Sequence, residues 1–197
     1  MCRYTGYPMW LAMTALQRQG RPIDYVKAVL SSWIGNLIGT LFGSAMFSYV
    51  TQAVAEEPYR SGLIKHINDD IVNSQWHIIF VKAIGCGHLV TLAMFFGTQN
   101  HDGVSKSIGL YLPFLMSTTA RLPHTVEYMY LSLISMMLGG PLSIGAFFWK
   151  SLLPITLGNT IGGAIFVGGY NWWAYMYCED RSIAKDRWAD IEDEVGD

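Results

Sequence analysis

The chain has 197 residues, of which 51% are hydrophobic and 14% are charged, whereas about 25% of the residues of an ordinary soluble domain are charged. The formal net charge is −2 and no basic patch with interleaved aromatic residues is present, so the sequence excludes nucleic-acid binding. The three cysteines are scattered without a CxxC pair; neither a disulfide framework nor a metal site follows, and we expect no cofactor.

Five apolar segments follow one another along the chain. They cover approximately residues 4–16, 28–50, 76–97, 108–138 and 147–177. A helix needs roughly 20 residues to cross a bilayer, so the second and third segments predict ordinary spans. The first segment is only about half a crossing long, and we interpret it as part of a span.

The fourth apolar segment is too long for one crossing. As a single helix, residues 108–138 would extend roughly 46 Å, whereas the hydrocarbon core is about 30 Å thick. Its middle contains Arg121, Pro123 and His124. Because proline removes a backbone donor and polar side chains are costly against lipid, we predict that the helix breaks there. Irregular backbone at membrane depth persists only when it is buried or lines a cavity, so the break indicates a pathway.

A short signature occurs twice inside these apolar segments. Residues 34–39 read Ile-Gly-Asn-Leu-Ile-Gly, and residues 157–162 read Leu-Gly-Asn-Thr-Ile-Gly. Glycines four residues apart let two helices approach closely, while Asn36 and Asn159 can bond backbone groups that would otherwise be unpaired. Two further spans lie between the copies, so the copies run in opposite directions. This arrangement predicts an inverted repeat, the usual plan of a transporter or channel.

The basic residues outside the spans predict the orientation of the chain. Seven of them fall on one side of the membrane, namely Arg18, Arg21, Lys27, Lys106, Arg181, Lys185 and Arg187. Because basic loops face the cytoplasm, we expect a multi-pass protein of the cell membrane with a cytoplasmic C-terminus. The predicted membrane domain covers residues 1–178, and residues 179–197 form a cytoplasmic acidic tail.

Three motifs make the chain similar to the formate/nitrite transporter family. They are the segment Leu153–Gly163, a Leu-Pro and Met approach to a loop that ends in His, and a Lys-x-Ile-x-Cys pattern followed by Leu-Val. The residues of the last two motifs are Leu112, Pro113, Met116, His124, Lys82, Ile84, Cys86, Leu89 and Val90. The resemblance implies an all-α integral membrane protein with an aquaporin-like inverted repeat of three plus three helices, the second and fifth being broken. It also implies a homopentamer in which each protomer has its own pore for small monovalent anions.

The resemblance also shows what the chain lacks. Family members have a complete first span and a second span broken at a Leu-Phe-Thr-Gly loop, of which only Tyr4-Thr5-Gly6 remains here. We therefore expect an N-terminally truncated member without the first helix and part of the second. Five further positions depart from the family pattern, namely Gly87 for Asn, Ser117 for an aromatic residue, Arg121 for Gly, Pro123 for an acidic residue and Tyr128 for Asn.

Several roles at the break are implied by the resemblance. Lys82 would attract anions in a vestibule, or alternatively extend its amine to the membrane interface. Thr5 and His124 would face each other at the broken helices, with His124 donating a hydrogen bond or a proton. The alternative for His124 is a satisfied core histidine.

Four other residues complete the predicted pathway. Arg121 either pairs with Glu127, as intramembrane charges commonly do, or binds an anion. Ser117 would lie at the constriction. Asn36 and Asn159 would satisfy backbone groups at the helix breaks and so support the pore.

The sequence thus predicts passage of small monovalent weak-acid anions such as formate or nitrite, coupled to protons through the central histidine. The alternative is a non-transporting membrane protein, or a subunit that only assembles with intact partners. An enzyme is not expected, because the histidines lack metal-ligand spacing and no nucleophile motif is present. An aquaporin would need Asn-Pro-Ala at both half-helices, and the sequence contains no Asn-Pro.

Overall fold

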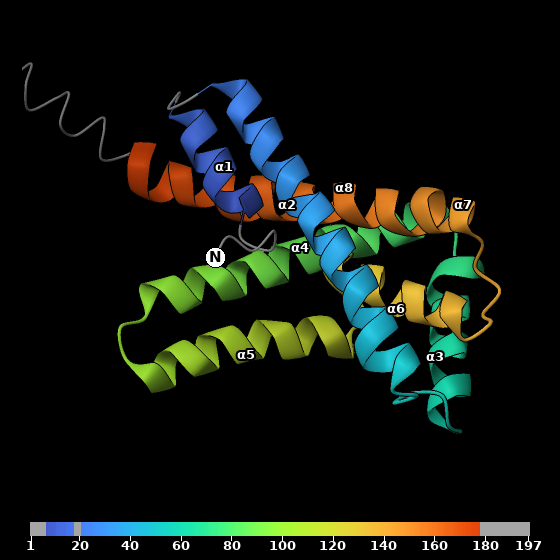
Figure 1. Ribbon diagram of the computed structural model, residues 1–197. Helices are drawn as coiled ribbons and strands as arrows, with labels where there is room; N and C mark the ends of the chain where they lie inside the picture. The colour runs from blue at the N-terminus through green and yellow to red at the C-terminus, as the bar shows by residue number, and fades with distance from the viewer. Residues whose placement is uncertain (1–6, 18–20, 178–197) are drawn as a thin grey trace, which may run out of the picture.

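The computed structural model describes residues 7–17 and 21–177, and all regular structure in these residues is helical (Figure 1). The helices are α1 (Tyr7–Leu16), α2 (Pro22–Gly43), η2 (Ser44–Val50), α3 (Tyr59–Ile67), η3 (Asn68–Val72), α4 (Trp76–Gln99), α5 (Gly103–Thr119), α6 (Thr125–Met137), α7 (Ile144–Ala146), η4 (Phe147–Leu152), α8 (Leu153–Ile161), η5 (Gly162–Gly169) and η6 (Trp172–Tyr177), where η denotes a π-helical stretch. The elements α2 and η2 form one continuous helix, as do α3 with η3 and all elements from α7 to η6.

Three continuous helices of the described residues are long and apolar enough to cross a membrane. They are Ile23–Val50, Trp76–Gln99 and Ile144–Tyr175, which correspond to the second, third and fifth predicted segments. The helix containing α2 begins earlier than hydropathy predicts, because Pro22 in its first turn has a backbone angle suited to helix entry. Thr5 and the predicted acidic tail, residues 179–197, lie outside the described residues.

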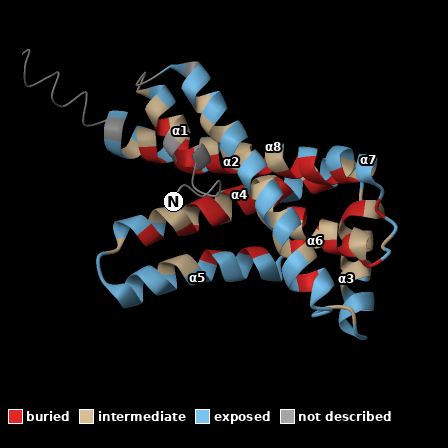
Figure 2. Cartoon of the chain, in the orientation of Figure 1, coloured by how far each residue is buried: buried red, intermediate tan, exposed pale blue. Residues whose placement is uncertain are grey.

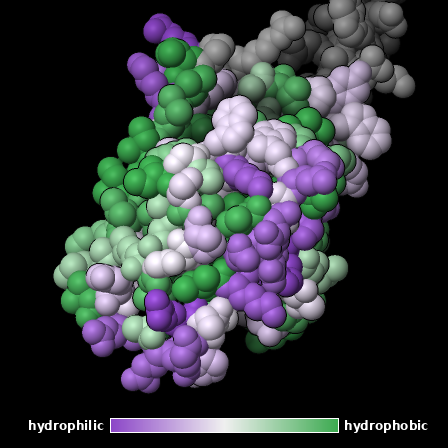
Figure 3. All heavy atoms as spheres, turned by 90° about the vertical axis from the view of Figure 1, so that its right-hand side faces the viewer, coloured by the Kyte–Doolittle hydropathy of each residue, from purple (hydrophilic) through white to green (hydrophobic). Residues whose placement is uncertain are grey.

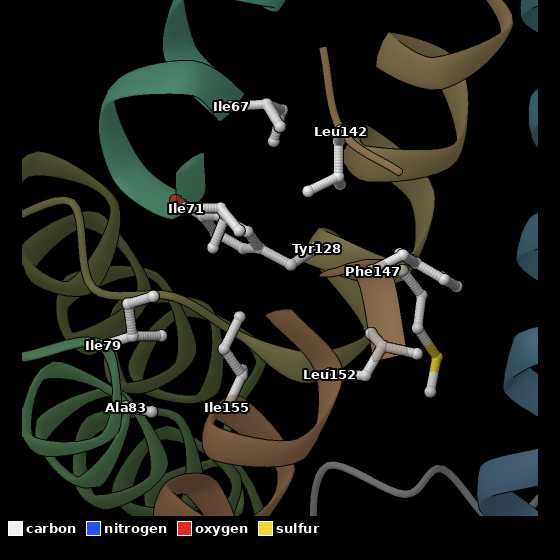
Figure 4. Close-up of a cluster of buried hydrophobic side chains, with 10 residues drawn as sticks. Ile67, Ile71, Ile79, Ala83, Tyr128, Leu142, Phe147, Leu152 and Ile155 are labelled. Carbon is white, nitrogen blue, oxygen red and sulfur yellow. The ribbon is translucent and has the colours of Figure 1, made fainter. Parts of the chain in front are cut away.

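The connection between η2 and α4 contains a helix, α3 with η3, that hydropathy alone does not predict. Its many polar residues lower the average hydropathy, yet Ile67 and Ile71 lie four residues apart on one face and are both 0% exposed. Figure 4 shows these two side chains among residues of α4, α6, η4 and α8. A helix at this place therefore completes the core beside the break.

The second glycine signature lies where α4 and α8 cross. A Cβ atom on Gly162 would lie 2.1 Å from the carbonyl oxygen of Ile84, and one on Gly87 would lie 2.3 Å from that of Asn159. Only glycine permits this approach, so backbones pack directly against each other, as small residues allow in membrane helices.

The first glycine signature has no such partner among the described residues. Cβ atoms on Gly35 and Gly39 would meet nothing within 4 Å, and Figure 2 shows much of the α2 surface exposed. The side chains of Ile34 and Ile38 on the same helix are 50% and 62% exposed. The two copies of the signature therefore differ in packing despite their similar sequences.

Polar and apolar surfaces are separated on the molecule. Figure 3 views the end at which α3 and α7 lie, and hydrophilic residues gather there beside a hydrophobic flank. The outer faces of α2 and α5 carry exposed apolar side chains, including Leu30, Phe42, Ile108 and Leu115. Such faces suit contact with lipid rather than water.

Candidate functional site

The candidate site is the non-helical segment between α5 and α6. Helix α5 ends at Thr119 and α6 begins at Thr125, within the stretch where the sequence predicts a break. Pro123 has no N–H to continue a helix, and a proline also disfavours helical backbone at the residue before it. The chain therefore leaves the helical conformation after Thr119 and resumes it at Thr125.

The end of α5 has the hydrogen bonds of a Schellman motif. The N–H of Leu122 donates to the carbonyl of Ser117 and that of Arg121 to the carbonyl of Thr118, both over 3.0 Å. Arg121 occupies the left-handed position of this motif, with φ +51°, where glycine is usual. Gly139, with φ +87°, has the same position at the end of α6. Helix α5 therefore ends in a common Schellman motif, but an arginine occupies the left-handed position that glycine usually takes.

His124 stands at the entrance to α6. It has extended backbone angles, φ −101° and ψ 139°, and its carbonyl accepts the N–H of Tyr128 over 2.9 Å. The imidazole is partly buried and makes no hydrogen bond to any other described residue.

Asn159 holds the break from α8. Its buried side-chain amide donates to the carbonyl oxygens of Pro123 at 3.0 Å and Ile155 at 2.9 Å, with that of Ala83 on α4 at 3.3 Å. Within the described residues its Oδ1 atom is buried without a partner. This geometry joins α4, α8 and the segment before His124.

Asn36 does not have the same surroundings. Its amide donates over 2.7 Å to the carbonyl of Ser32, one turn earlier in its own helix. The two asparagines share a sequence signature, but only Asn159 reaches the break that the structure describes. The difference arises because α8 crosses α4 beside the break. The face of α2 that carries Gly35 and Gly39 has no described neighbour.

Ser117 is buried in the last turns of α5. Its hydroxyl lies 3.3 Å from the Sγ atom of Cys86 on α4, and Ser117 is only 4% exposed. The contact fixes the break side of α5 against α4, next to Gly87. Lys82, one turn earlier on α4, is exposed and makes no hydrogen bond or ion pair with another described residue.

Arg121 has a partner other than the predicted one. Its Nη2 atom lies 3.1 Å from Oδ1 of Asp70 and 2.9 Å from Nδ1 of His66, and no ion pair joins it to Glu127 in the described part of the chain. The expected pairing with Glu127 is therefore wrong. The reason is that α3 and η3 pack beside α6 and bring Asp70 to the break.

Asp70 and His66 were not among the predicted site residues. Asp70 also accepts a hydrogen bond from the Tyr128 hydroxyl over 2.7 Å. The sequence does contain a pattern that predicts this helix, because Ile67 and Ile71 are spaced by four residues. The same helix places His66 and Asp70 on one face, one turn apart. The pattern is a short signal in a charged connection, and average hydropathy hides it.

Comparison with known proteins decides the family. Residues 4–173 match the formate/nitrite transporter family. The chain belongs to that family. It is 26% identical over 186 residues to a probable formate transporter of Methanothermobacter thermautotrophicus and 28% identical over 152 residues to a formate-nitrite transporter of Entamoeba histolytica. The chain spans 68% and 42% of the lengths of these two relatives.

Solved structures support the same fold. An FNT family ion channel superposes with a TM-score of 0.77 at 22% identity, covering 87% of this chain and 68% of that one. A pentameric formate channel with formate bound gives a TM-score of 0.66 at 18% identity, covering 88% of this chain and 82% of that one. These relatives are transporters and channels rather than enzymes, in agreement with the prediction. The protein is a multi-pass membrane protein of a transport family, and its regular structure in residues 7–17 and 21–177 is helical throughout.

Proposed function

We propose that this protein forms a membrane pathway for small monovalent weak-acid anions such as formate or nitrite. The observation that carries the proposal is the break between α5 and α6, which leaves the imidazole of His124 without a bond to the described residues at a point held by Asn159. Irregular backbone at membrane depth is tolerated where it is buried or lines a cavity.

The energetics favour passage as a neutral acid. A charge at the bilayer centre costs about 2.5–3.5 kcal/mol or more, while protonating a carboxylic acid of pKa near 4 at pH 7 costs about 4 kcal/mol. The two costs are comparable. A histidine that donates a proton or a strong hydrogen bond can therefore determine whether the solute crosses as an anion or as a neutral acid. His124 takes this role because its imidazole can offer a ring N–H to an anion at the break.

The other predicted site residues have supporting roles in this proposal. Exposed Lys82 attracts anions, Thr5 contributes its hydroxyl to the pathway, and Ser117 lines the constriction on the α5 side. The assembly is a homopentamer, by analogy with the pentameric formate channel that has a similar fold. The C-terminus is cytoplasmic because basic residues concentrate on its side of the membrane; labelling of a tag at Asp197 from outside intact cells would contradict this orientation.

The test is uptake of labelled formate, nitrite and acetate into vesicles. It compares the 197-residue chain with an extended version that adds the part of the Methanothermobacter relative that this chain does not span. We expect saturable uptake by the extended version and near-background uptake by the chain alone, because an inverted-repeat pore needs both broken helices. Robust uptake by the chain alone would contradict the need for the added part. Passage of neutral solutes without any of the three anions would overturn the proposed function.

A second candidate is a subunit that only assembles with intact partners. The face of α2 around Gly35 and Gly39 favours it, because nothing in the described residues covers that face. Co-expression with a full-length relative distinguishes the two. Uptake that appears only in the mixed assembly would support the second candidate.

A further inference from the structure

The two oxygens of the Asp70 carboxylate bind both flanks of the break. Oδ1 lies 3.1 Å from Nη2 of Arg121, three residues before His124. Oδ2 accepts the hydroxyl proton of Tyr128, four residues after His124, over 2.7 Å. Figure 4 shows the Tyr128 side chain extending toward η3, where Ile71 lies. One carboxylate therefore spans the segment that carries His124.

The surrounding groups complete this cluster. A guanidinium has only donors, so Nδ1 of His66 accepts from Arg121 over 2.9 Å, and the ring proton is left on Nε2, 3.5 Å from Oδ2 of Asp70. The Asp70 side chain is 11% exposed and that of Arg121 is 49% exposed. The carboxylate is thus largely enclosed, while the cation extends to the surface.

The backbone conformation of Arg121 explains why its side chain needs a bonding partner, here called the anchor, namely the carboxylate of Asp70. Its φ of +51° is the left-handed conformation that a Cβ atom disfavours and that glycine adopts freely. Gly139 ends α6 with the same pair of hydrogen bonds, and glycine takes this backbone conformation without strain. Sparsely populated backbone of this kind persists only when the surrounding structure holds it.

We infer that Asp70 is a positioning residue for His124, acting through Arg121 on one flank and Tyr128 on the other. The inference rests on the proposed function, because the placement of His124 matters for transport only if the pathway passes the break. Asp70 itself does not contact the substrate. It fixes the two ends of the segment so that the imidazole keeps one position.

Hydrogen exchange measured by mass spectrometry on the full chain in lipid nanodiscs tests the anchor directly. Asp70→Asn and Arg121→Ala should speed exchange in peptides covering residues 117–128 by about tenfold or more. Arg121→Gly should have a smaller effect, because glycine needs no anchor at this backbone angle. Asp69→Asn, a neighbouring exposed aspartate without a side-chain partner in the described residues, is the matched control and should change exchange less than about twofold.

Transport then tests the consequence in the extended version. Asp70→Asn should lower the maximal uptake rate about fivefold or more while the KM for formate changes less, and Asp70→Glu should restore part of the rate. Exchange that is unchanged, or that rises equally in all helices, would overturn the inference. Locally faster exchange with unaltered uptake would overturn the link to His124 and leave the proposed function standing. If the unmodified extended protein moves no anion, the proposed function fails, and with it the transport role of Asp70.

Discussion

The side-chain amide of Asn159 donates a hydrogen bond to the carbonyl oxygen of Pro123 over 3.0 Å. This contact joins α8 to the segment directly before His124, across 36 positions of the sequence. A buried carbonyl without a donor costs about 1–3 kcal/mol. The same amide group therefore stabilises the break and fixes its place against the core.

Replacing Asn159 by Leu should lower the free energy of unfolding by about 1–3 kcal/mol, because the carbonyl of Pro123 loses its donor. Asn36→Leu is the matched control, since the Asn36 amide bonds only within its own helix; its effect should stay within about 0.5 kcal/mol. Denaturant unfolding in detergent, followed by tryptophan fluorescence, measures both. Equal losses would show that the contact at the break is unimportant for stability.

Alanine substitutions should separate the two glycine signatures. Gly162→Ala places a Cβ atom 2.1 Å from the Ile84 carbonyl and should destabilise the protein by roughly 1–3 kcal/mol through overpacking. Gly39→Ala meets open space and should be neutral or stabilising, because alanine favours helix by about 1 kcal/mol over glycine. Thermal unfolding in detergent gives the comparison. A similar loss at Gly39 would mean that another helix packs on α2.

His124→Phe should abolish anion uptake by the extended version, with a loss of about a hundredfold or more if the imidazole donates a proton. Phenylalanine keeps a ring of similar size but has no donor. His101→Phe, in the exposed connection between α4 and α5, should leave uptake unaltered. Retention of uptake by His124→Phe, with a normal melting profile, would exclude a role for this imidazole.

Asp102 should give the start of α5 a pH dependence. The Ser105 N–H donates to its carboxylate over 2.8 Å and holds the pKa of that carboxyl below its ordinary value. A lowered pKa means that the cap is fully present above about pH 4 and is lost as the pH falls through the lowered pKa. The Ser105 amide resonance, followed by NMR during acidification, should move with a midpoint below about pH 4. Asp102→Asn keeps a capping oxygen and should abolish that titration; a persisting midpoint would assign it to another group.

Much of the candidate site could be predicted from the sequence because its causes are local. Pro123 cannot continue a helix, and the length of the fourth apolar segment exceeds one crossing, so a break near His124 follows from chain geometry alone. The glycine signature around Asn159 likewise predicts a close helix crossing. These features depend on residues near one another in the chain.

The partners of Arg121 depend on the tertiary structure. Asp70 lies far earlier in the sequence, on a helix whose polar residues hide its buried face from a hydropathy average, so the nearer Glu127 was the expected partner. The two glycine signatures were also equivalent by sequence, yet only one is packed among the described residues. Helix packing decides both outcomes, because it selects which distant side chains meet and which glycine face finds a neighbour.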